Sequence, residues 1–319
     1  MGQYILRRVI IAIPTIFAST LVVFLVLRVL PGDVALFIAL GTDASGVASE
    51  AAIEAIREEL GLNRPLPVQY FVWIGNALRG EFGESAFTHR TVAYEITSRL
   101  PLTVQLAVMG QILAFAIGIP LGIVSAMRRD KAVDTISRFW SILFLAMPQF
   151  WVALMLLLFT SRVFNWSPPL GYFLLWEDPG NNMLQLGPAA LVLGVGGAAI
   201  AARMTRSSML EVLGEDYIRT ARAKGLMAGA VIIRHALRNA LIPVISLSAV
   251  TFAFLLAGTV ILETVYAIPG LGSLMLTSIR TRDYEVIQAL VLISVVVVVL
   301  LNLVVDIVYA WLDPRISYS

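Results

Sequence analysis

Six long stretches of the 319-residue chain contain no Asp, Glu, Lys or Arg, and they constrain the fold more than any other feature. Together they hold 138 residues, and each is 19 to 28 residues long. An α-helix of about 20 apolar residues crosses the hydrocarbon core of a bilayer. We therefore predict an all-α, polytopic membrane protein with six transmembrane helices. The stretches are Val9–Leu27, Leu100–Met127, Phe139–Ser161, Pro179–Ala202, Asn239–Leu262 and Val286–Val305.

The composition excludes several classes of protein. Hydrophobic residues make up 59% of the chain and charged residues 14%, whereas an ordinary soluble domain has about 25% charged residues. Such a chain has too little polar surface for a soluble enzyme, a nucleic-acid-binding module or a disordered regulator, so no nucleic-acid partner is expected. Because it has no cysteine and only two histidines, His89 and His235, we expect no disulfide and no metal site.

The basic residues predict the orientation in the membrane. With both termini in the cytoplasm, 14 Arg and Lys residues lie inside and 9 outside, while 6 acidic residues lie inside and 14 outside. Cytoplasmic loops are enriched in Lys and Arg, so both termini are predicted to be cytoplasmic. The first stretch follows Arg7 and Arg8 but is longer than the apolar core of a signal peptide, about 7–15 residues. We interpret it as a retained helix.

Three regions follow from this topology. Residues 1–99 hold the first transmembrane helix and an extracytoplasmic segment, and residues 100–312 hold helices two to six. Residues 313–319 form a cytoplasmic tail. Helices four and five are joined by a cytoplasmic loop over 206–242, which is the longest stretch predicted to face the cytoplasm.

The extracytoplasmic segment is predicted to contain two helices. Ser49 is a suitable N-cap and Gly61 a suitable stop for a short helix between them. A second helix over about 67–79 has apolar residues at helical spacing, among them Tyr70 and Trp73. It lies either on the outer membrane face, with both rings at the headgroup level, or on the protein's own outer surface.

Prolines and small residues mark particular places within the spans. Pro120 and Pro148 are expected to kink helices two and three, because proline removes a backbone donor and its ring clashes with the preceding turn. Small residues recur over Gly118–Gly122 in helix two and Gly194–Ala202 in helix four. Such residues allow membrane helices to approach closely, so both stretches are predicted to be packing faces.

The loop over 206–242 is the most informative part of the sequence. Gly214 ends the preceding helix, and Gly225 suits the left-handed residue that follows a helix C-terminus. Between them, acidic residues precede basic residues in the order that the helix dipole favours, so a helix is predicted over about 216–224 with caps at both ends. The charged residues are Glu215, Asp216, Arg222 and Lys224.

This helix is too short to be stable alone, because isolated helices need about 12–15 residues. We expect it to be ordered only when another surface docks on it. Its apolar residues Ile218 and Ala221 favour docking over the alternative, a solvated basic loop that merely satisfies the charge rule. A second helix is predicted over about 228–241, with Pro243 opening helix five.

Tyr217–Leu226 and His235–Pro243 resemble the cytoplasmic EAA loop of permease subunits of bacterial ATP-driven (ABC) importers, in the dipeptide, oligopeptide and nickel branch. The general pattern begins Glu-Ala-Ala, where this chain has Arg219, Thr220 and Ala221, so only the last Ala and a later Gly are kept. This departure and the longer spacing to the proline look typical of the branch. Further matching segments are Leu60–Leu62, Pro65–Tyr70, Gly80–Ser85, Arg99–Pro101 and Glu263–Gly272.

The resemblance implies the type I importer fold, in a prokaryotic inner (plasma) membrane. It also implies a homologous second permease, two ATPase subunits and an extracytoplasmic substrate-binding protein as partners. The chain has no Gly-x-x-x-x-Gly-Lys-[Ser/Thr] sequence, so ATP and Mg are expected on the ATPase subunits, with no cofactor and no enzymatic activity on this chain. The loop helix would dock in an ATPase groove as a coupling helix, through Asp216, Tyr217, Arg219, Thr220, Ala221, Arg222, Lys224 and Gly225.

The resemblance makes di- or oligopeptides the first candidate substrates. Nickel chelates, glutathione and sugars are alternatives, because one scaffold serves many ligands. An ion-coupled secondary transporter usually has ionisable residues near the bilayer midplane. Here only Asp306 lies within a predicted span, where an interfacial pairing is favoured over a proton relay. A membrane enzyme is not supported, since no span has paired carboxylates, a histidine or a nucleophile with its base.

Candidates for the substrate path are few. Glu263 ends helix five on the outer side, and Pro269 and Gly270 follow in a predicted loop that dips back toward the pathway. This region is either an outer gate or simply a turn with an exposed acid. Gln149 and Asn302 are polar residues within spans, and they either face the pathway or form interhelical hydrogen bonds.

Overall fold

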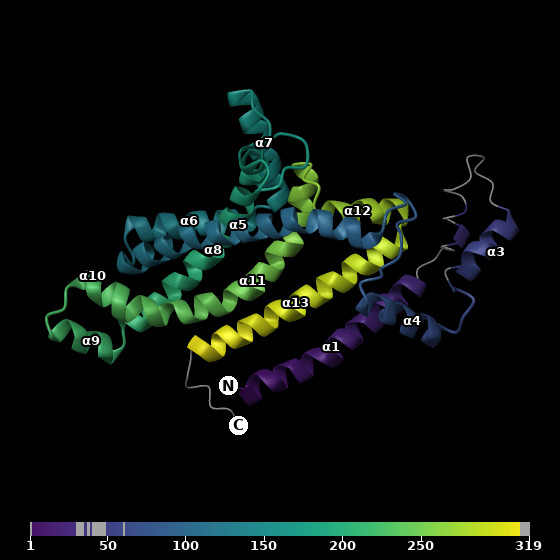
Figure 1. Ribbon diagram of the computed structural model, residues 1–319. Helices are drawn as coiled ribbons and strands as arrows, with labels where there is room; N and C mark the ends of the chain where they lie inside the picture. The colour runs from purple at the N-terminus through teal and green to yellow at the C-terminus, as the bar shows by residue number, and fades with distance from the viewer. Residues whose placement is uncertain (1, 30–34, 37–38, 40–48, 60, 313–319) are drawn as a thin grey trace. The chain divides into compact units, whose positions relative to one another are not determined.

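The computed structural model describes residues 2–29, 35–36, 39, 49–59 and 61–312. Regular structure in these ranges is helical, apart from one antiparallel bridge between Glu84 and Thr91. The helices of Figure 1 are α1 (Gly2–Val29), α3 (Glu50–Glu59), α4 (Leu66–Leu78), α5 (Val92–Met127), α6 (Ala132–Ala146), α7 (Gln149–Phe164), α8 (Pro179–Leu213), α9 (Asp216–Ala223), α10 (Ala228–Ala230), the π-helix η1 (Val231–Leu237), α11 (Arg238–Val265), α12 (Leu271–Thr281) and α13 (Tyr284–Leu312).

All six charge-free stretches lie on helices, namely α1, α5, the α6–α7 pair, α8, α11 and α13. Within the described residues, four helices are long and apolar enough to cross a membrane, or five when α6 and α7 count as one broken span. The apolar part of α1, Ile10–Val26, is shorter. The chain is thus an all-α, polytopic membrane protein, while the count of six spans and the side of the termini stay predictions.

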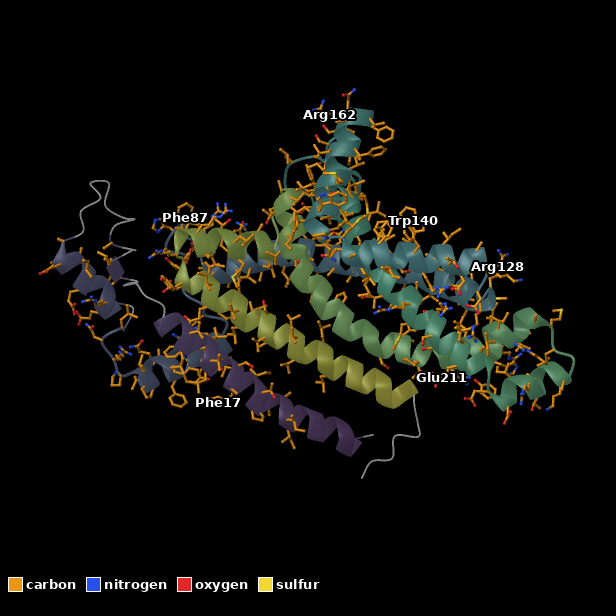
Figure 2. The ribbon with its side chains drawn as sticks, turned by 180° about the vertical axis from the view of Figure 1, so that it is seen from behind. Phe17, Phe87, Arg128, Trp140, Arg162 and Glu211 are labelled. Carbon is orange, nitrogen blue, oxygen red and sulfur yellow. The ribbon has the colours of Figure 1, made fainter. Side chains whose placement is uncertain are left out.

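Large apolar side chains are exposed on the helices. Trp140 of α6 and Phe17 of α1, both labelled in Figure 2, are 50% and 48% exposed. Exposed apolar surface on this scale is typical of a protein that contacts lipid or another protein. The exposure therefore agrees with a membrane location for these helices.

The helices group into two compact units, which we describe separately. Among the described residues, one unit holds Pro101–Ser273 and Leu301–Leu312, and the other holds those between Gly2 and Leu100 together with Leu274–Leu300. In the first unit α8 packs against α6, α7 and α11. Its main apolar core is formed by Leu102, Leu106, Ala153, Leu186, Ala189, Ala190, Val192, Leu193, Leu262, Tyr266 and Ile268.

The two stretches of small residues pack against each other, which confirms them as packing faces. A Cβ atom added at Gly118 of α5 would lie 2.6 Å from the backbone oxygen of Ala198 in α8. One added at Gly122 would lie 2.6 Å from the backbone oxygen of Ala202. Two helices at this distance leave no room for larger side chains, so dispersion contacts along both backbones hold α5 to α8.

Helix three differs from the expected single kinked helix. α6 ends at Ala146, and α7 begins after Pro148 at an angle of 101° to α6. Met147 between them is extended, with ψ 130°, because the proline ring disfavours helical backbone in the residue before it. By contrast α5 continues through Pro120.

The predicted boundary between a loop helix and helix five is wrong. Residues 228–265 form one continuous helical run through α10, η1 and α11, and Pro243 lies inside α11. η1 is a π-helix over Val231–Leu237. A proline is tolerated inside a membrane helix where other groups satisfy the backbone carbonyl that it frees, so Pro243 does not have to open a new helix.

The second unit contains α1, α3 and α4. The Ser49 hydroxyl accepts a hydrogen bond from the Ala52 amide at 3.2 Å, which confirms the predicted cap of α3. Tyr70 of α4 is 3% exposed, and its hydroxyl lies 2.8 Å from that of Thr20 in α1. Its ring packs edge-on against Phe24. The structure thus favours packing on the protein's own surface over a headgroup position for Tyr70.

Candidate functional site

The predicted loop helix is present as α9, Asp216–Ala223. Its C-terminus ends in a Schellman motif, with the Gly225 amide bonded to the Arg222 carbonyl at 3.0 Å and the Leu226 amide bonded to the Ala221 carbonyl at 3.4 Å. Gly225 has φ +78°, as expected for the left-handed residue after a helix. The predicted C-terminal cap is confirmed.

The expected side-chain cap at the N-terminus of α9 is wrong. Glu215 is the N-cap residue, but its side chain forms no capping hydrogen bond. Effective N-caps are short side chains such as Ser, Thr, Asp and Asn, whose oxygen reaches the first free amides. Asp216 instead pairs with Arg219 at 3.2 Å, and both side chains are largely exposed.

The apolar face of α9 is covered by this chain itself. Ile218 is fully buried and Ala221 is 7% exposed. They pack in a cluster with Ala126 of α5, Met209 of α8, and Val231, Ala236 and Ala240 of the run that follows. The Asn239 side chain also donates a hydrogen bond to the Tyr217 hydroxyl at 2.7 Å. Because this packing orders α9, the expectation that it needs an external partner to be ordered is corrected.

The opposite face of α9 is exposed and forms a candidate docking surface, here called the coupling surface. Tyr217 is 40% exposed, and the Arg219 side chain is 78% exposed. Two exposed apolar residues that the sequence reasoning missed, Leu226 at 43% and Met227 at 80%, follow directly. The coupling surface consists of Asp216, Tyr217, Arg219, Thr220, Arg222, Lys224, Gly225, Leu226 and Met227, all of them exposed.

The coupling surface lies at one end of the first unit. α9 and α10 stand beyond the ends of α6 and α8 in Figure 1, and Arg128 and Glu211 mark the same end in Figure 2. The charge pattern predicts that this end faces the cytoplasm. Seven of the eight predicted coupling residues are exposed there, and the eighth, Ala221, faces inward.

Glu263 is not an exposed acid. Its side chain is fully buried in α11. The carboxylate accepts hydrogen bonds from the Thr103 hydroxyl at 2.7 Å and from the Ser273 amide at 2.9 Å. The Leu271 amide donates to the Thr103 hydroxyl at 2.8 Å. These bonds join α5, α11 and the N-terminus of α12 around one carboxylate.

The segment after Glu263 forms a tight turn against that carboxylate, and Pro269 and Gly270 lie within it. A Cβ atom at Gly270 would overlap the Glu263 carboxyl group, and one at Gly272 would lie 2.5 Å from the Val260 Cα atom. The turn therefore closes on Glu263 only because these positions are glycines. Sequence reasoning missed α12 itself, although Leu271 and Leu274 are at helical spacing.

Of the two remaining predicted path residues, the structure describes the side chain of Gln149 but not that of Asn302. Gln149 begins α7, and a Cβ atom added at Gly196 of α8 would lie 3.3 Å from its Nε2 atom. The side chain of Asn302 lies outside the described residues. The structure thus groups Glu263, Pro269 and Gly270, and it places Gln149 separately, against α8.

A buried amide cluster was also missed by the sequence reasoning. Asn182 donates hydrogen bonds to the Gln105 side chain at 3.1 Å and to the Phe173 carbonyl at 2.7 Å. Gln185 donates to the Gly171 carbonyl at 3.0 Å. Asn182 and Gln185 are fully buried, so the cluster holds the segment before α8 against α5 and α8.

A solved structure shares the fold of this chain. The chain matches a solved structure of the MetNI methionine ABC transporter in an inward-facing conformation, with a TM-score of 0.55 and 20% sequence identity over 69% of this chain and 97% of that chain. The fold is therefore that of the membrane subunit of a type I ABC importer.

Sequence comparisons identify the family. The family described as "binding-protein-dependent transport system inner membrane component" matches residues 118–318, and its N-terminal companion matches residues 1–107. This chain belongs to that family, whose members are multi-pass inner membrane permease subunits and not enzymes.

Two curated relatives match over their whole length. A probable peptide ABC transporter permease, y4tP of Sinorhizobium fredii, is 40% identical over 318 residues, covering 100% of both chains. The glutathione transport system permease GsiC of Escherichia coli strain K12 is 39% identical over 319 residues, again covering 100% of both. The resemblance to the peptide branch of ABC permeases is thereby confirmed.

Proposed function

We propose that this chain is one of two permease subunits that together form the translocation pathway of an ATP-driven importer of small peptides. The observation that supports this most directly is the coupling surface, an exposed charged helix fixed by its apolar face to the long membrane helices. Relatives named for peptide and glutathione transport support the substrate class, since glutathione is itself a peptide.

The coupling surface is proposed to dock on one of two cytoplasmic ATPase subunits, which bind ATP and Mg. Because Ile218 and Ala221 pack against Met209 of α8 and Val231 of η1, a push on α9 moves α8 and the η1–α11 run with it. Rigid-body motion of packed helices is a common way to transmit a switch. An extracytoplasmic binding protein is proposed to deliver the substrate at the opposite side.

The turn around Glu263, Pro269 and Gly270 is proposed as an outer gate element. Its hydrogen bonds join α5, α11 and α12, so relative motion of these helices must break them. Gln149 and Asn302 remain candidates for the path. Nickel chelates and sugars are alternative substrates, and an ion-coupled secondary transporter is the alternative mechanism.

The test is reconstitution of the full complex, comprising this chain, the second permease, the ATPase subunits and the binding protein, in proteoliposomes. We expect ATP-dependent uptake of a labelled dipeptide or of glutathione, and ATP hydrolysis that rises when the loaded binding protein is added. Uptake by this chain without any ATPase, driven by an ion gradient, would contradict the proposal.

A matched pair of variants tests the coupling surface. Met227→Asp changes an apolar residue that is 80% exposed beside α9, and Leu170→Asp makes the same change at a residue that is 76% exposed between α7 and α8. We expect Met227→Asp to weaken ATPase binding and uptake, and Leu170→Asp to retain both. Equal ATPase binding by the two variants would show that the coupling surface is elsewhere.

A further inference from the structure

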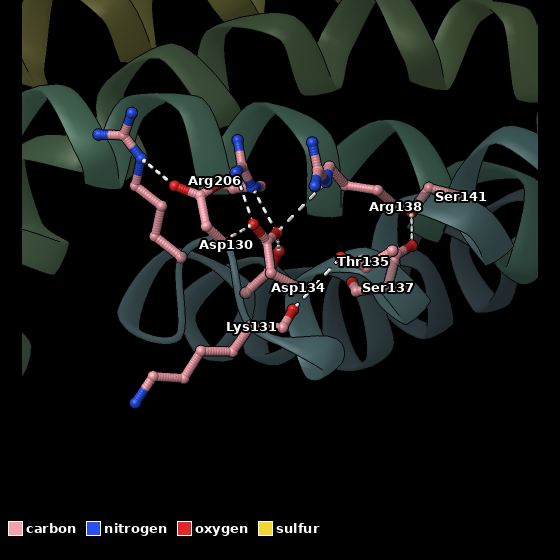
Figure 3. Close-up of polar contacts among 10 residues, drawn as sticks. Asp130, Lys131, Asp134, Thr135, Ser137, Arg138, Ser141 and Arg206 are labelled. Carbon is pink, nitrogen blue, oxygen red and sulfur yellow. Dashed lines mark hydrogen bonds and ion pairs between the residues drawn. The ribbon is translucent and has the colours of Figure 1, made fainter.

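An ion pair with a fully buried carboxylate joins three helices near the end of the first unit that holds the coupling surface (Figure 3). Asp134, in the first turn of α6, is fully buried. Arg206 of α8 donates two hydrogen bonds to its carboxylate, from Nε to Oδ1 at 2.7 Å and from Nη2 to Oδ2 at 2.8 Å. Ser125 of α5 donates to Oδ1 at 2.5 Å, and the Asp130 amide donates to Oδ2 at 3.0 Å. Here this set is called the clamp.

Stability alone does not account for such an arrangement. The Asp134 carboxylate is removed from water, whereas the Arg206 side chain stays 19% exposed. An ion pair with a buried charge must overcome the cost of desolvation, and apolar residues of similar volume often stabilise a protein as well or better. What a bidentate Arg–carboxylate pair adds is geometry, because two parallel hydrogen bonds fix both distance and orientation. The clamp therefore sets how α5, α6 and α8 are placed relative to one another.

The clamp is close to the packing site of α9 along two helices. Arg206 precedes Met209 by three residues, or about 4.5 Å along α8, and Met209 packs against Ile218 and Ala221. On α5, Ser125 is adjacent to Ala126, which belongs to the same cluster. A displacement of α9 thus acts on α5 at Ala126, next to Ser125, and on α8 at Met209, less than one turn from Arg206. Ser125 and Arg206 are the residues of these helices that bind Asp134.

We propose that Asp134 and Arg206 are positioning residues for energy coupling, which make the ends of α5, α6 and α8 move with α9 as one body. This inference rests on the proposed docking of an ATPase at the coupling surface. α9 itself packs on α5, α8 and the run after it, and its apolar cluster includes no α6 residue among those described. The clamp extends the moving body to α6 through Asp134.

The decisive variant is the double replacement Asp134→Leu with Arg206→Met, measured in the full reconstituted complex. It replaces the ion pair by apolar side chains of similar length. Because it also removes the acceptor of the Ser125 hydroxyl and the Asp130 amide, subunit stoichiometry is measured alongside. We expect the stimulation of ATP hydrolysis by the loaded binding protein, with dialanine or glutathione as probe, to fall about 10-fold, within the range of typical coupling free energies. Basal hydrolysis should stay unchanged.

Arg206→Lys is the second variant, because lysine keeps the charge but cannot form the two parallel bonds. It should show the same selective loss of stimulated ATP hydrolysis. It therefore tests the clamp even if the double variant does not assemble. The matched control is Arg129→Met, which removes an ion pair with Asp130 at 3.2 Å whose side chains are 67% and 72% exposed. This control should couple like the wild type.

Each outcome has one meaning. Normal stimulation in either assembled clamp variant overturns the positioning role, as does a loss of basal hydrolysis equal to the loss of stimulation. If the wild-type complex shows no ATP-dependent uptake, the proposed function itself fails. If the wild type transports and Met227→Asp uncouples while the clamp variants couple normally, only the clamp inference fails.

Discussion

α9 and α12 are both short helices that follow a turn at the end of a long helix, and they are held in opposite ways. α9 is held by apolar contacts of Ile218 and Ala221, and its polar face is exposed. The N-terminus of α12 is held by hydrogen bonds to the buried Glu263 and to Thr103. Apolar anchoring leaves charged groups available to a partner, whereas polar anchoring uses them inside the protein.

This contrast suggests a division of roles between the two ends of α11. The α9 end presents exposed side chains, so the proposed docking of a partner would not disturb its own core. The Glu263 end has its carboxylate and backbone amides bonded internally, so any change there must break internal bonds. Four predictions test the contrast, in order of decreasing expected effect.

Glu263→Ala should have the largest effect. It leaves the Thr103 hydroxyl and the Ser273 amide without the carboxylate, and each buried polar group left without a partner costs about 1–3 kcal/mol. Thermal unfolding of the purified complex should begin at a clearly lower temperature. Thr264→Ala is the matched control, since Thr264 is exposed and its hydroxyl donates to the Val260 carbonyl in its own helix. Equal unfolding midpoints for the two variants would refute the anchoring role.

Ala221→Asp should disrupt the apolar packing of α9 against α5, α8 and the run that follows. A carboxylate placed in the apolar cluster has no partner there, which costs at least about 2 kcal/mol of local stability. Substrate-stimulated ATP hydrolysis and uptake should fall together, while membrane insertion is retained. Ala55→Asp, the same change at an exposed position of α3, should leave both activities near wild type. An equal loss of activity in both variants would mean that the added charge causes the loss, and not the disrupted apolar packing of α9.

Gly225→Val should have a smaller effect at the other end of α9. Gly225 has φ +78°, and left-handed backbone costs a residue with a Cβ atom about 1–2 kcal/mol. Coupling should be partly lost, measured as the ratio of ATP hydrolysis with and without loaded binding protein. Gly229→Val is the control, because an added Cβ atom meets nothing within 4 Å and its φ is not positive. An unchanged ratio in Gly225→Val would contradict the need for the Schellman turn.

The last pair of variants should not alter activity and tests the orientation. Glu81→Cys and Ala228→Cys introduce single cysteines at exposed positions into a chain that has none. The charge pattern predicts that an impermeant thiol reagent labels Glu81→Cys in intact cells and Ala228→Cys only after the membrane is opened. The reverse labelling would place the coupling surface outside and overturn the proposed docking.

The sequence by itself determined the features that depend on neighbours along the chain. Charge-free stretches long enough for a span predict the membrane helices, because the bilayer core sets both length and polarity. Local backbone signals predict the bounds of α3 and the end of α9, where Ser49 and Gly225 act within a few residues of their own position. The small residues of α5 and α8 correctly predict close packing, although not which helices would meet.

Only the tertiary structure decided what depends on partners distant in sequence. α5 continues through Pro120, whereas α6 ends two residues before Pro148, although both residues are prolines. Glu263 follows a charge-free stretch, which leaves open whether it is exposed, and its burial depends on partners such as Thr103, 160 residues away. Arg206 and Asp134 are 72 residues apart, and no local pattern pairs them. The helices that pack around a residue come from elsewhere in the chain, and they determine whether it is buried. Burial in turn determines whether a charged group is free or bonded.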